Sequence, residues 1–155
     1  MNNSGKGSVC FTGHRKIIHL RLKERVTEII TILAEEGYRN FITGGALGFD
    51  MLAARCVVDL KDKYDGITLT IAIPCREQSS RWSRREKQAY ENMLDAADDI
   101  VVLSEEYFSG CMHNRNRYMV DNSEVCVCYM YKRNGGTSYT VDYAEKKGKT
   151  IVMVI

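Results

Sequence analysis

Residues 40–50 of the chain read Asn-Phe-Ile-Thr-Gly-Gly-Ala-Leu-Gly-Phe-Asp, a short apolar run followed by a glycine-rich turn. The next predicted element is a helix at 46–63, so the whole unit is a strand, a tight turn and a helix. Gly44 and Gly45 can adopt positive φ angles and let the backbone approach a ligand closely. This unit indicates an α/β fold with its turn at the carboxyl end of a strand.

The same alternation continues along the rest of the chain. Strands are predicted at 8–12, 40–43, 67–73, 99–103, 125–131 and 150–155, and helices at 20–36, 46–63, 80–97, 112–122 and 138–147. The strands are apolar almost without interruption, which is typical of strands covered by helices on both faces. The pattern predicts a Rossmann-like, doubly wound, three-layer α/β/α fold with a mainly parallel sheet of about six strands.

The predicted helix at 80–97 shows a helical period clearly. Trp82 and Met93 belong to its apolar side, so we expect Trp82 in the core, with stacking on a base as the alternative. Either Ser79 or Ser80 is expected to cap the first turn.

Length and composition favour one globular domain at 8–155, preceded by a flexible polar segment at 1–7. The formal charge of +2 is too small to imply binding to nucleic acid. The sequence shows no secretory signal and no apolar stretch long enough to cross a bilayer, so we expect a cytoplasmic protein without membrane contacts. A homo-oligomer is compatible with the composition, although no motif specifies one.

The six cysteines are predicted to be buried, reduced thiols. They are Cys10, Cys56, Cys75, Cys111, Cys126 and Cys128. None forms a C-x-x-C pair and several lie in apolar runs, which argues against a disulfide framework or a zinc site. No metal site is predicted.

Ligands of open parallel sheets bind beyond the carboxyl ends of the strands, and polar, glycine-rich segments collect there. The candidate ligand-binding residues are Gly13, His14, Arg15, Gly44, Gly45, Gly48, Asp50, Arg76, Asn116, Gly135, Gly136 and Thr137. A helix N-terminus offers free N–H groups and a partial positive charge, so it favours an anion. We therefore expect a small nucleotide-type ligand, without a cofactor that the sequence identifies.

The glycines have separate expected roles. Gly44, Gly45 and Gly136 would cradle a phosphate, although a tight strand–helix turn alone also explains such glycines. Gly48 would let the second helix pack close to the sheet, and Thr137 would cap the last helix.

The polar candidates complete this site. Arg15 and Arg115 would neutralise the phosphate. Asp50 would repel a nearby phosphate, so it would hold ribose hydroxyls or the base, or a metal, or else it only stabilises the helix dipole. His14 is a possible general acid or base, or a hydrogen-bonded loop residue. Phe49 could stack on a base.

Four segments together resemble the YpsA-like family of the SLOG superfamily, which is named for Smf/DprA and LOG. They are Phe-Thr-Gly-His-Arg at 11–15, the glycine turn at 43–50, Arg-Asn-Arg-Tyr-Met-Val-Asp at 115–121 and Gly-Gly-Thr at 135–137. The resemblance implies a Rossmann-like fold, a bacterial cytoplasmic origin and a site for a nucleotide or a relative of NAD or ADP-ribose.

A second similarity is to the LOG-type phosphoribohydrolases, which cleave the N-glycosidic bond of nucleoside monophosphates. It rests on Met-His-Asn-Arg at 112–115, which looks like their M-H-x-R segment. Their next motif, P-G-G-x-G-T-x-x-E, is altered here to Asn134, Ser138, Tyr139 and Asp142 at the proline, third glycine, threonine and glutamate. Arg115 and Asp142 are the candidate catalytic residues that this similarity implies.

Three functions follow. The first is a nucleotide-binding or nucleotide-sensing domain, and the alternative is a nucleotide N-glycosidase that uses Arg115 and Asp142. The third is a single-stranded DNA-binding protein related to DprA, which the low net charge makes the weakest of the three.

Overall fold

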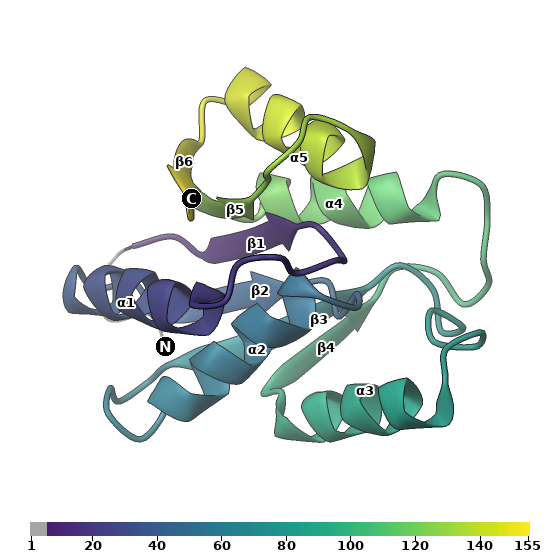
Figure 1. Ribbon diagram of the computed structural model, residues 1–155, viewed down its shortest axis with the longest axis horizontal. Helices are drawn as coiled ribbons and strands as arrows, with labels where there is room; N and C mark the ends of the chain where they lie inside the picture. Colours follow the sequence, from purple (N-terminus) through teal and green to yellow (C-terminus); the bar gives the residue numbers. More distant parts are fainter. Residues whose placement is uncertain (1–5) are drawn as a thin grey trace.

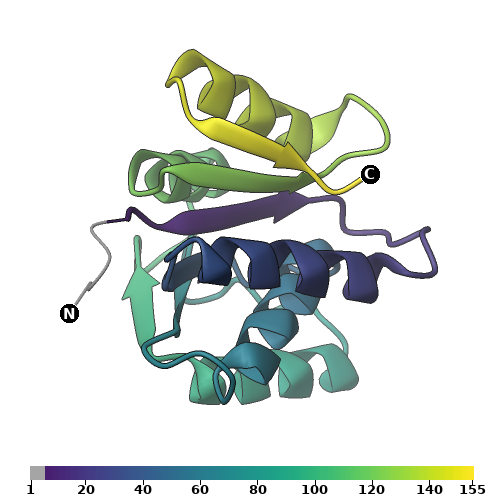
Figure 2. The same ribbon diagram turned by 90° about the vertical axis from the view of Figure 1, so that its left-hand side faces the viewer.

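The computed structural model describes residues 6–155. It contains strands β1 (Val9–Gly13), β2 (Asn40–Thr43), β3 (Thr68–Ile73), β4 (Asp99–Val102), β5 (Val125–Tyr129) and β6 (Thr150–Met153), and helices α1 (Leu22–Glu35), α2 (Phe49–Leu60), α3 (Arg84–Ala96), α4 (Cys111–Asp121) and α5 (Gly135–Lys146). The strands form one parallel sheet in the order β4-β3-β2-β1-β5-β6. Figure 2 shows β1, β5 and β6 side by side and running in the same direction.

Helices cover both faces of this sheet, so the predicted three-layer Rossmann-like fold is confirmed. Helix α2 packs on β1, β2 and β3 and contacts α1 and α3, whereas α4 and α5 pack together against the opposite face (Figure 1). All strand pairs are parallel, so the carboxyl ends of the strands lie at one edge. The loops that follow β1, β2, β3 and β5 meet there.

Aromatic rings fill the core between the sheet and helices α1 and α2. Phe11 lies 6.2 Å from Phe41 and 6.3 Å from Phe49, and Phe49 lies 5.5 Å from Tyr129, all measured between ring centroids. Phe49 is fully buried in this cluster. The expectation that Phe49 could stack on a ligand base is therefore wrong.

The predicted element types are correct, but all five helices begin at other residues, and three of them begin three or more residues from the predicted start. Helix α2 begins at Phe49 rather than at 46, and α5 begins at Gly135 rather than at 138. Helix α3 begins after Ser83, whose hydroxyl accepts from the Glu86 N–H at 3.1 Å while the Glu86 carboxylate accepts from the Ser83 N–H at 2.9 Å. This reciprocal capping box replaces the predicted cap at Ser79 or Ser80.

Trp82 does not belong to α3, because it lies in the turn before the helix begins. Its partly buried ring makes an edge-on contact with Tyr90, with 5.1 Å between the centroids. The expected place of Trp82 in the core is thus correct, although its place on the helix is wrong.

The cysteines and the ends of the chain complete the description. All six cysteines are buried and free, and the Sγ atoms of Cys126 and Cys128 lie 3.6 Å apart. The predicted flexible segment at 1–7 falls largely on residues 1–5, which lie outside the described part, while the Gly7 N–H donates to Glu124 Oε1 at 3.1 Å. Within residues 6–155, no helix is long and apolar enough to span a bilayer.

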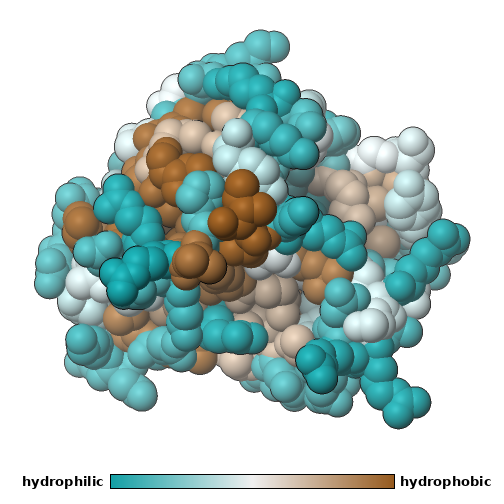
Figure 3. All heavy atoms as spheres, in the orientation of Figure 1, coloured by the Kyte–Doolittle hydropathy of each residue, from teal (hydrophilic) through white to brown (hydrophobic). Residues whose placement is uncertain are grey.

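Hydrophobic side chains gather on the surface between α1 and β6, as Figure 3 shows. Ile18, Leu20 and Ile155 are exposed there and line a groove of about 460 Å³ beside Val154. Exposed apolar surface of this kind often marks contacts with other molecules. The expectation of a homo-oligomer stays untested.

Candidate ligand site

A cleft of about 510 Å³ opens at the carboxyl edge of the sheet. It is lined by Phe11, Thr12, Gly13, His14 and Arg15 from β1 and its loop, by Ala46 and Asp50, by Met112, His113, Arg115, Asn116 and Met119 from α4, and by Asn134, Gly135, Gly136 and Thr137 at the start of α5. Eight of the twelve candidate ligand-binding residues are among them. The four that do not line it are Gly44, Gly45, Gly48 and Arg76.

The N-terminus of α5 opens into this cleft. Asn134 precedes the helix and makes no side-chain capping bond, so no side chain at that position satisfies the first free N–H groups. Gly136 is exposed, and among residues 6–155 a Cβ added there would meet Asn116 Nδ2 alone, at 3.8 Å. Thr137 is the third residue of the helix rather than its predicted cap. The result is an open end of a helix dipole facing a polar cavity.

The glycine turn after β2 is closed by the protein itself. Gly44 and Gly45 are buried, and the Ala46 N–H donates to Asp50 Oδ2 at 3.3 Å. The Gly44 backbone also bonds to the Asp50 carboxylate. The expectation that these two glycines cradle a ligand phosphate therefore needs correction, because the anion at this turn is the side chain of Asp50.

Arg115 is the second group that closes this turn. Its side chain is only 4% exposed, and Nη1 donates to the carbonyl of Gly44 at 2.5 Å and to that of Ala72 at 3.3 Å. Nη1 also donates to Gln78 Oε1 at 3.3 Å, and Nε donates to Asn116 Oδ1 at 2.9 Å. Arg115 thus ties α4 to the ends of β2 and β3, with little of its guanidinium left for a ligand.

Asp50 and Arg115 are buried groups of opposite charge that lie near each other at the floor of the cleft, without a direct salt bridge among the described residues. Burial raises the pKa of Asp50 to about 6, and the nearby guanidinium of Arg115 and the amides of Ala46 and Gly44 oppose that rise. Asp50 is therefore mostly ionised at pH 7. The two charges balance each other, so this floor is polar but close to neutral overall.

Gly48 packs against the loop after β1 rather than against the sheet. It has a φ of 86°, and an added Cβ would overlap the carbonyl of Arg15. Beside it, the Phe49 N–H donates to the carbonyl of His14 at 3.2 Å. The prediction that Gly48 lets α2 pack on the sheet is corrected: this glycine lets the start of α2 contact the loop after β1.

His14 is buried and holds two loops together. Its Nε2 lies 3.1 Å from the carbonyl of Lys132, and its ring lies 4.4 Å from the ring of Tyr131. Burial lowers the pKa of His14, so the ring is neutral at pH 7. These contacts favour the hydrogen-bonded loop role over acid–base chemistry and fix the position of Arg15 at the rim.

Two candidates lie away from the cleft. Arg76 is exposed and its Nε donates to Glu105 Oε1 at 2.6 Å, while Asp142 accepts from Arg133 Nη1 at 3.1 Å on the exposed side of α5. The structure therefore does not bring Asp142 and Arg115 together in the cleft.

Seven residues that line the cleft were not among the predicted site residues, and two of them, His113 and Asn134, are polar residues beside the α5 start. The other five are Phe11, Thr12, Ala46, Met112 and Met119. His113 is exposed in the first turn of α4, and its ring lies 4.0 Å from the ring of Tyr139. His113 and Asn134 were both quoted as parts of motifs, so their position beside Arg115 and Gly135 in the sequence was the available signal.

The fold and this cleft define a Rossmann-like α/β domain with a polar site at the carboxyl edge of its sheet. The model of the YspA SLOG family matches residues 10–154, so the chain belongs to that family. It is 36% identical over 140 residues to the uncharacterized SPbeta prophage-derived protein YoqJ of Bacillus subtilis, covering 82% of each chain. It is 31% identical to a UPF0398 protein of Halalkalibacterium halodurans, over 86% of this chain and 71% of the relative.

Solved structures with low sequence identity share the fold. DNA processing protein A of Helicobacter pylori, described for its binding of single-stranded DNA, has a TM-score of 0.68 at 20% identity. That match covers 94% of this chain, which spans 64% of the DNA processing protein. The molybdenum cofactor carrier protein of Chlamydomonas reinhardtii has a TM-score of 0.59 at 21% identity, covering 96% of this chain and 75% of the carrier.

Proposed function

We propose that the protein binds a small nucleotide-type ligand whose phosphate lies at the N-terminus of α5. The observation that carries this proposal is the uncapped start of α5, where Gly135 and Gly136 face a cleft of about 510 Å³. Backbone N–H groups and the helix dipole favour an anion at this place. Phosphate is the anion that such glycine-rich helix starts commonly accept.

The charges around the cleft support a phosphate at α5 rather than at the turn after β2. Asp50 and Arg115 offset each other, and the Asp50 carboxylate would repel a phosphate near Gly44. Arg15 is exposed at the rim and keeps its guanidinium free for bidentate contact. Asn116 lies beside Gly136 and offers an amide for a further hydrogen bond.

The rest of the ligand would lie over the floor of the cleft. An ionised carboxylate accepts hydrogen bonds from hydroxyl groups, so Asp50 is suited to a ribose. The proposed ligand therefore has a phosphate at one end and a sugar next to it, as in a nucleotide or a relative of ADP-ribose.

Binding of single-stranded DNA is the second candidate. It is supported by the shared fold with DNA processing protein A and by the exposed Arg81, Arg84 and Arg85 around the start of α3. A fluorescence-anisotropy titration with a labelled oligonucleotide at low salt tests it, and true binding should weaken steeply as salt rises.

Isothermal titration calorimetry with AMP tests the main proposal. We expect wild-type protein to bind AMP and Gly136→Glu to lose at least about tenfold in affinity, because the new carboxylate repels the phosphate. Gly136→Gln is the matched control, since it adds nearly the same volume without charge and should lose much less. Position 136 has open space and no positive φ, so both variants should unfold at nearly the wild-type temperature.

Two results would contradict the proposal. One is wild-type protein that binds none of AMP, ADP, NAD and ADP-ribose. The other is equal loss of affinity in the Glu and Gln variants, which would mean that volume rather than charge at the start of α5 decides binding.

A further inference from the structure

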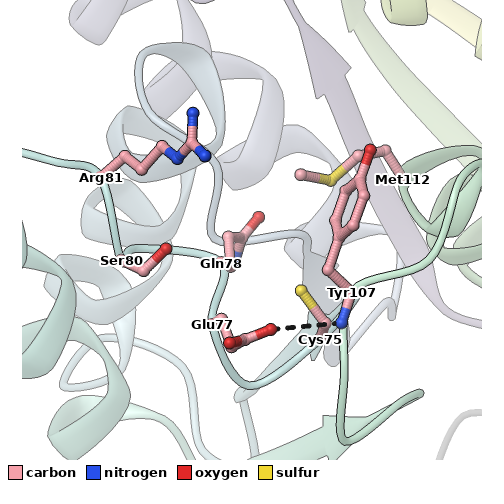
Figure 4. A pocket seen from close by; sticks show the side chains of 7 residues that line it. All are labelled: Cys75, Glu77, Gln78, Ser80, Arg81, Tyr107 and Met112. Carbon is pink, nitrogen blue, oxygen red and sulfur yellow. Dashed lines mark hydrogen bonds between the residues drawn. The ribbon is translucent and has the colours of Figure 1, made fainter.

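A second pocket, of about 500 Å³, lies beside the cleft at the carboxyl end of β3 (Figure 4). It is lined by Cys75, Glu77, Gln78, Ser80, Arg81, Tyr107 and Met112. These residues come from the loop after β3, the loop after β4 and the first turn of α4. The pocket therefore belongs to the same edge of the sheet as the cleft.

Among residues 6–155, Met112 alone lines both cavities. Its side chain is 41% exposed, and its Sδ accepts from Arg115 Nη2 at 3.9 Å. Methionine is unbranched and has three rotatable bonds, so it changes shape at little cost. The two cavities are thus neighbours across a flexible side chain.

The walls of the second pocket suit a planar polar ring. Tyr107 is 64% exposed and stands with Met112 on one side, while Ser80 and Arg81 lie on the other (Figure 4). The Tyr107 N–H donates to Glu77 Oε1 at 3.3 Å, which joins the two loops. Aromatic and guanidinium faces both stack on nucleobases.

At the floor of this pocket, the side chain of Gln78 already has hydrogen-bond partners. Its bond with Arg115 connects this floor to the floor of the cleft. Gln78 Nε2 donates to the carbonyl of Gly44 at 3.3 Å and to the Tyr90 hydroxyl at 3.1 Å, while its Oε1 accepts from Arg115. A ligand in the second pocket would therefore depend on the walls, Tyr107 and Arg81, for its contacts.

The volumes of the two cavities limit how many nucleotide units the site can bind. Ligand pockets commonly enclose about 300–1,000 Å³, so the cleft is large enough for one nucleotide by itself. The second pocket has almost the same volume, about 500 Å³. The pair of cavities has room for two nucleoside units, one on each side of Met112.

We propose that the second pocket binds the base of a second nucleotide unit, so that the preferred ligand is two nucleotides joined through phosphate across Met112. This inference rests on the proposed function, which places the phosphate of the first unit at α5. A free dinucleotide and two successive residues of a single strand share this chemistry, and Tyr107 and Arg81 determine the preference for the second unit.

Calorimetry with AMP and with the linear dinucleotide pApA separates this inference from the proposed function. Wild-type protein should bind pApA at least about tenfold more tightly than AMP, which is within the range that one stacked base contributes. Tyr107→Ala and Arg81→Ala should bring pApA close to the affinity of AMP and leave AMP unchanged. Phe108→Ala and Lys87→Ala, at exposed positions outside the pocket, are the controls and should keep the wild-type preference.

The possible outcomes distinguish the second subsite from the proposed function. Binding of AMP without a gain for pApA, or an unchanged preference in Tyr107→Ala and Arg81→Ala, overturns the second subsite and leaves the proposed function intact. Absence of AMP and pApA binding overturns both. A ten-residue oligo(dA) that binds no more tightly than pApA supports a free dinucleotide, whereas a further gain with length supports a strand that occupies the same two subsites.

Discussion

The turns after β2 and β5 have similar sequences, but the first is closed by side chains of the protein and the second is open. Each joins a buried strand to a helix through two adjacent glycines, Gly44-Gly45 in one and Gly135-Gly136 in the other. The second residue of α2 is Asp50, whose carboxylate reaches back to the amide of Ala46. The second residue of α5 is Gly136, which has no side chain to do so. One turn therefore carries its own anion, and the other is open to an anion from solution.

This contrast depends on a residue that is distant in sequence. Arg115 binds the carbonyl of Gly44, 71 positions away, and partly offsets the cost of burying Asp50. In the described part of the chain, no arginine makes a matching contact with the glycines after β5. A glycine-rich helix start thus predicts an anion but does not say whether the protein supplies it.

Removal of the arginine should have the largest effect on the closed turn. We expect Arg115→Ala to lower the free energy of unfolding by about 4 kcal/mol, because it removes the buried hydrogen bonds of the guanidinium and the positive charge near the buried Asp50 carboxylate. It also leaves the carbonyls of Gly44 and Ala72 without the guanidinium donor. Urea denaturation followed by circular dichroism at pH 7 measures this loss.

Arg117→Ala is the matched control on the same helix. Arg117 donates to the Tyr139 hydroxyl at 2.7 Å and holds no buried charge, so its loss should cost only about 1 kcal/mol. Similar losses of unfolding free energy in the two variants would show that Arg115 and Asp50 at the closed turn contribute no more to stability than an ordinary hydrogen bond.

The charge of Asp50 should make the closed turn sensitive to pH. Its pKa rises from an ordinary 3.8 to about 6 on folding, so the native state binds more protons between these values. That stabilisation is complete below pH 3.8 and is lost as the pH rises through 6. The change corresponds to about 3 kcal/mol.

Asp50→Asn does not titrate and isolates this effect. Between pH 4 and pH 7 the variant should gain about 2 kcal/mol relative to wild type, because part of the full change already occurs below pH 4. The gain is measured as the difference between their urea denaturation curves. The other carboxyl groups are common to both proteins and cancel in the difference. A difference that does not change with pH would mean that Asp50 titrates normally.

The sequence was sufficient for the order of strands and helices, since uninterrupted apolar runs such as that of β5 identify buried parallel strands. It was less reliable at helix starts, because Gly135 and Gly136 are poor helix formers that nonetheless begin α5. In the site, short loop motifs brought Gly13, His14 and Arg15 to the cleft, as neighbours in sequence must remain neighbours in space.

The failures in the site arose where long-range contacts decide. Nothing near Gly44 in the sequence indicates that Arg115, 71 positions away, will cover it. The role of Gly48 was also misjudged, because its neighbour is the carbonyl of Arg15 from another loop. Local pattern gives the identity of a helix start but not the side chain that packs onto it.

Substitution of one glycine in each turn by alanine should give the smallest difference in stability. It compares the packing of the closed and the open turn without a change of charge. Gly48 and Gly135 have φ angles of 86° and 72°, so either substitution strains the backbone by about 1 kcal/mol. At Gly48 the new Cβ also overlaps the carbonyl of Arg15, whereas at Gly135 it meets nothing within 4 Å. Gly48→Ala should therefore be less stable than Gly135→Ala by about 2 kcal/mol in thermal or urea denaturation. Equal losses of stability in the two variants would mean that the two turns are equally open. Close packing of the β2 turn would then not explain why a ligand is expected at the β5 turn instead.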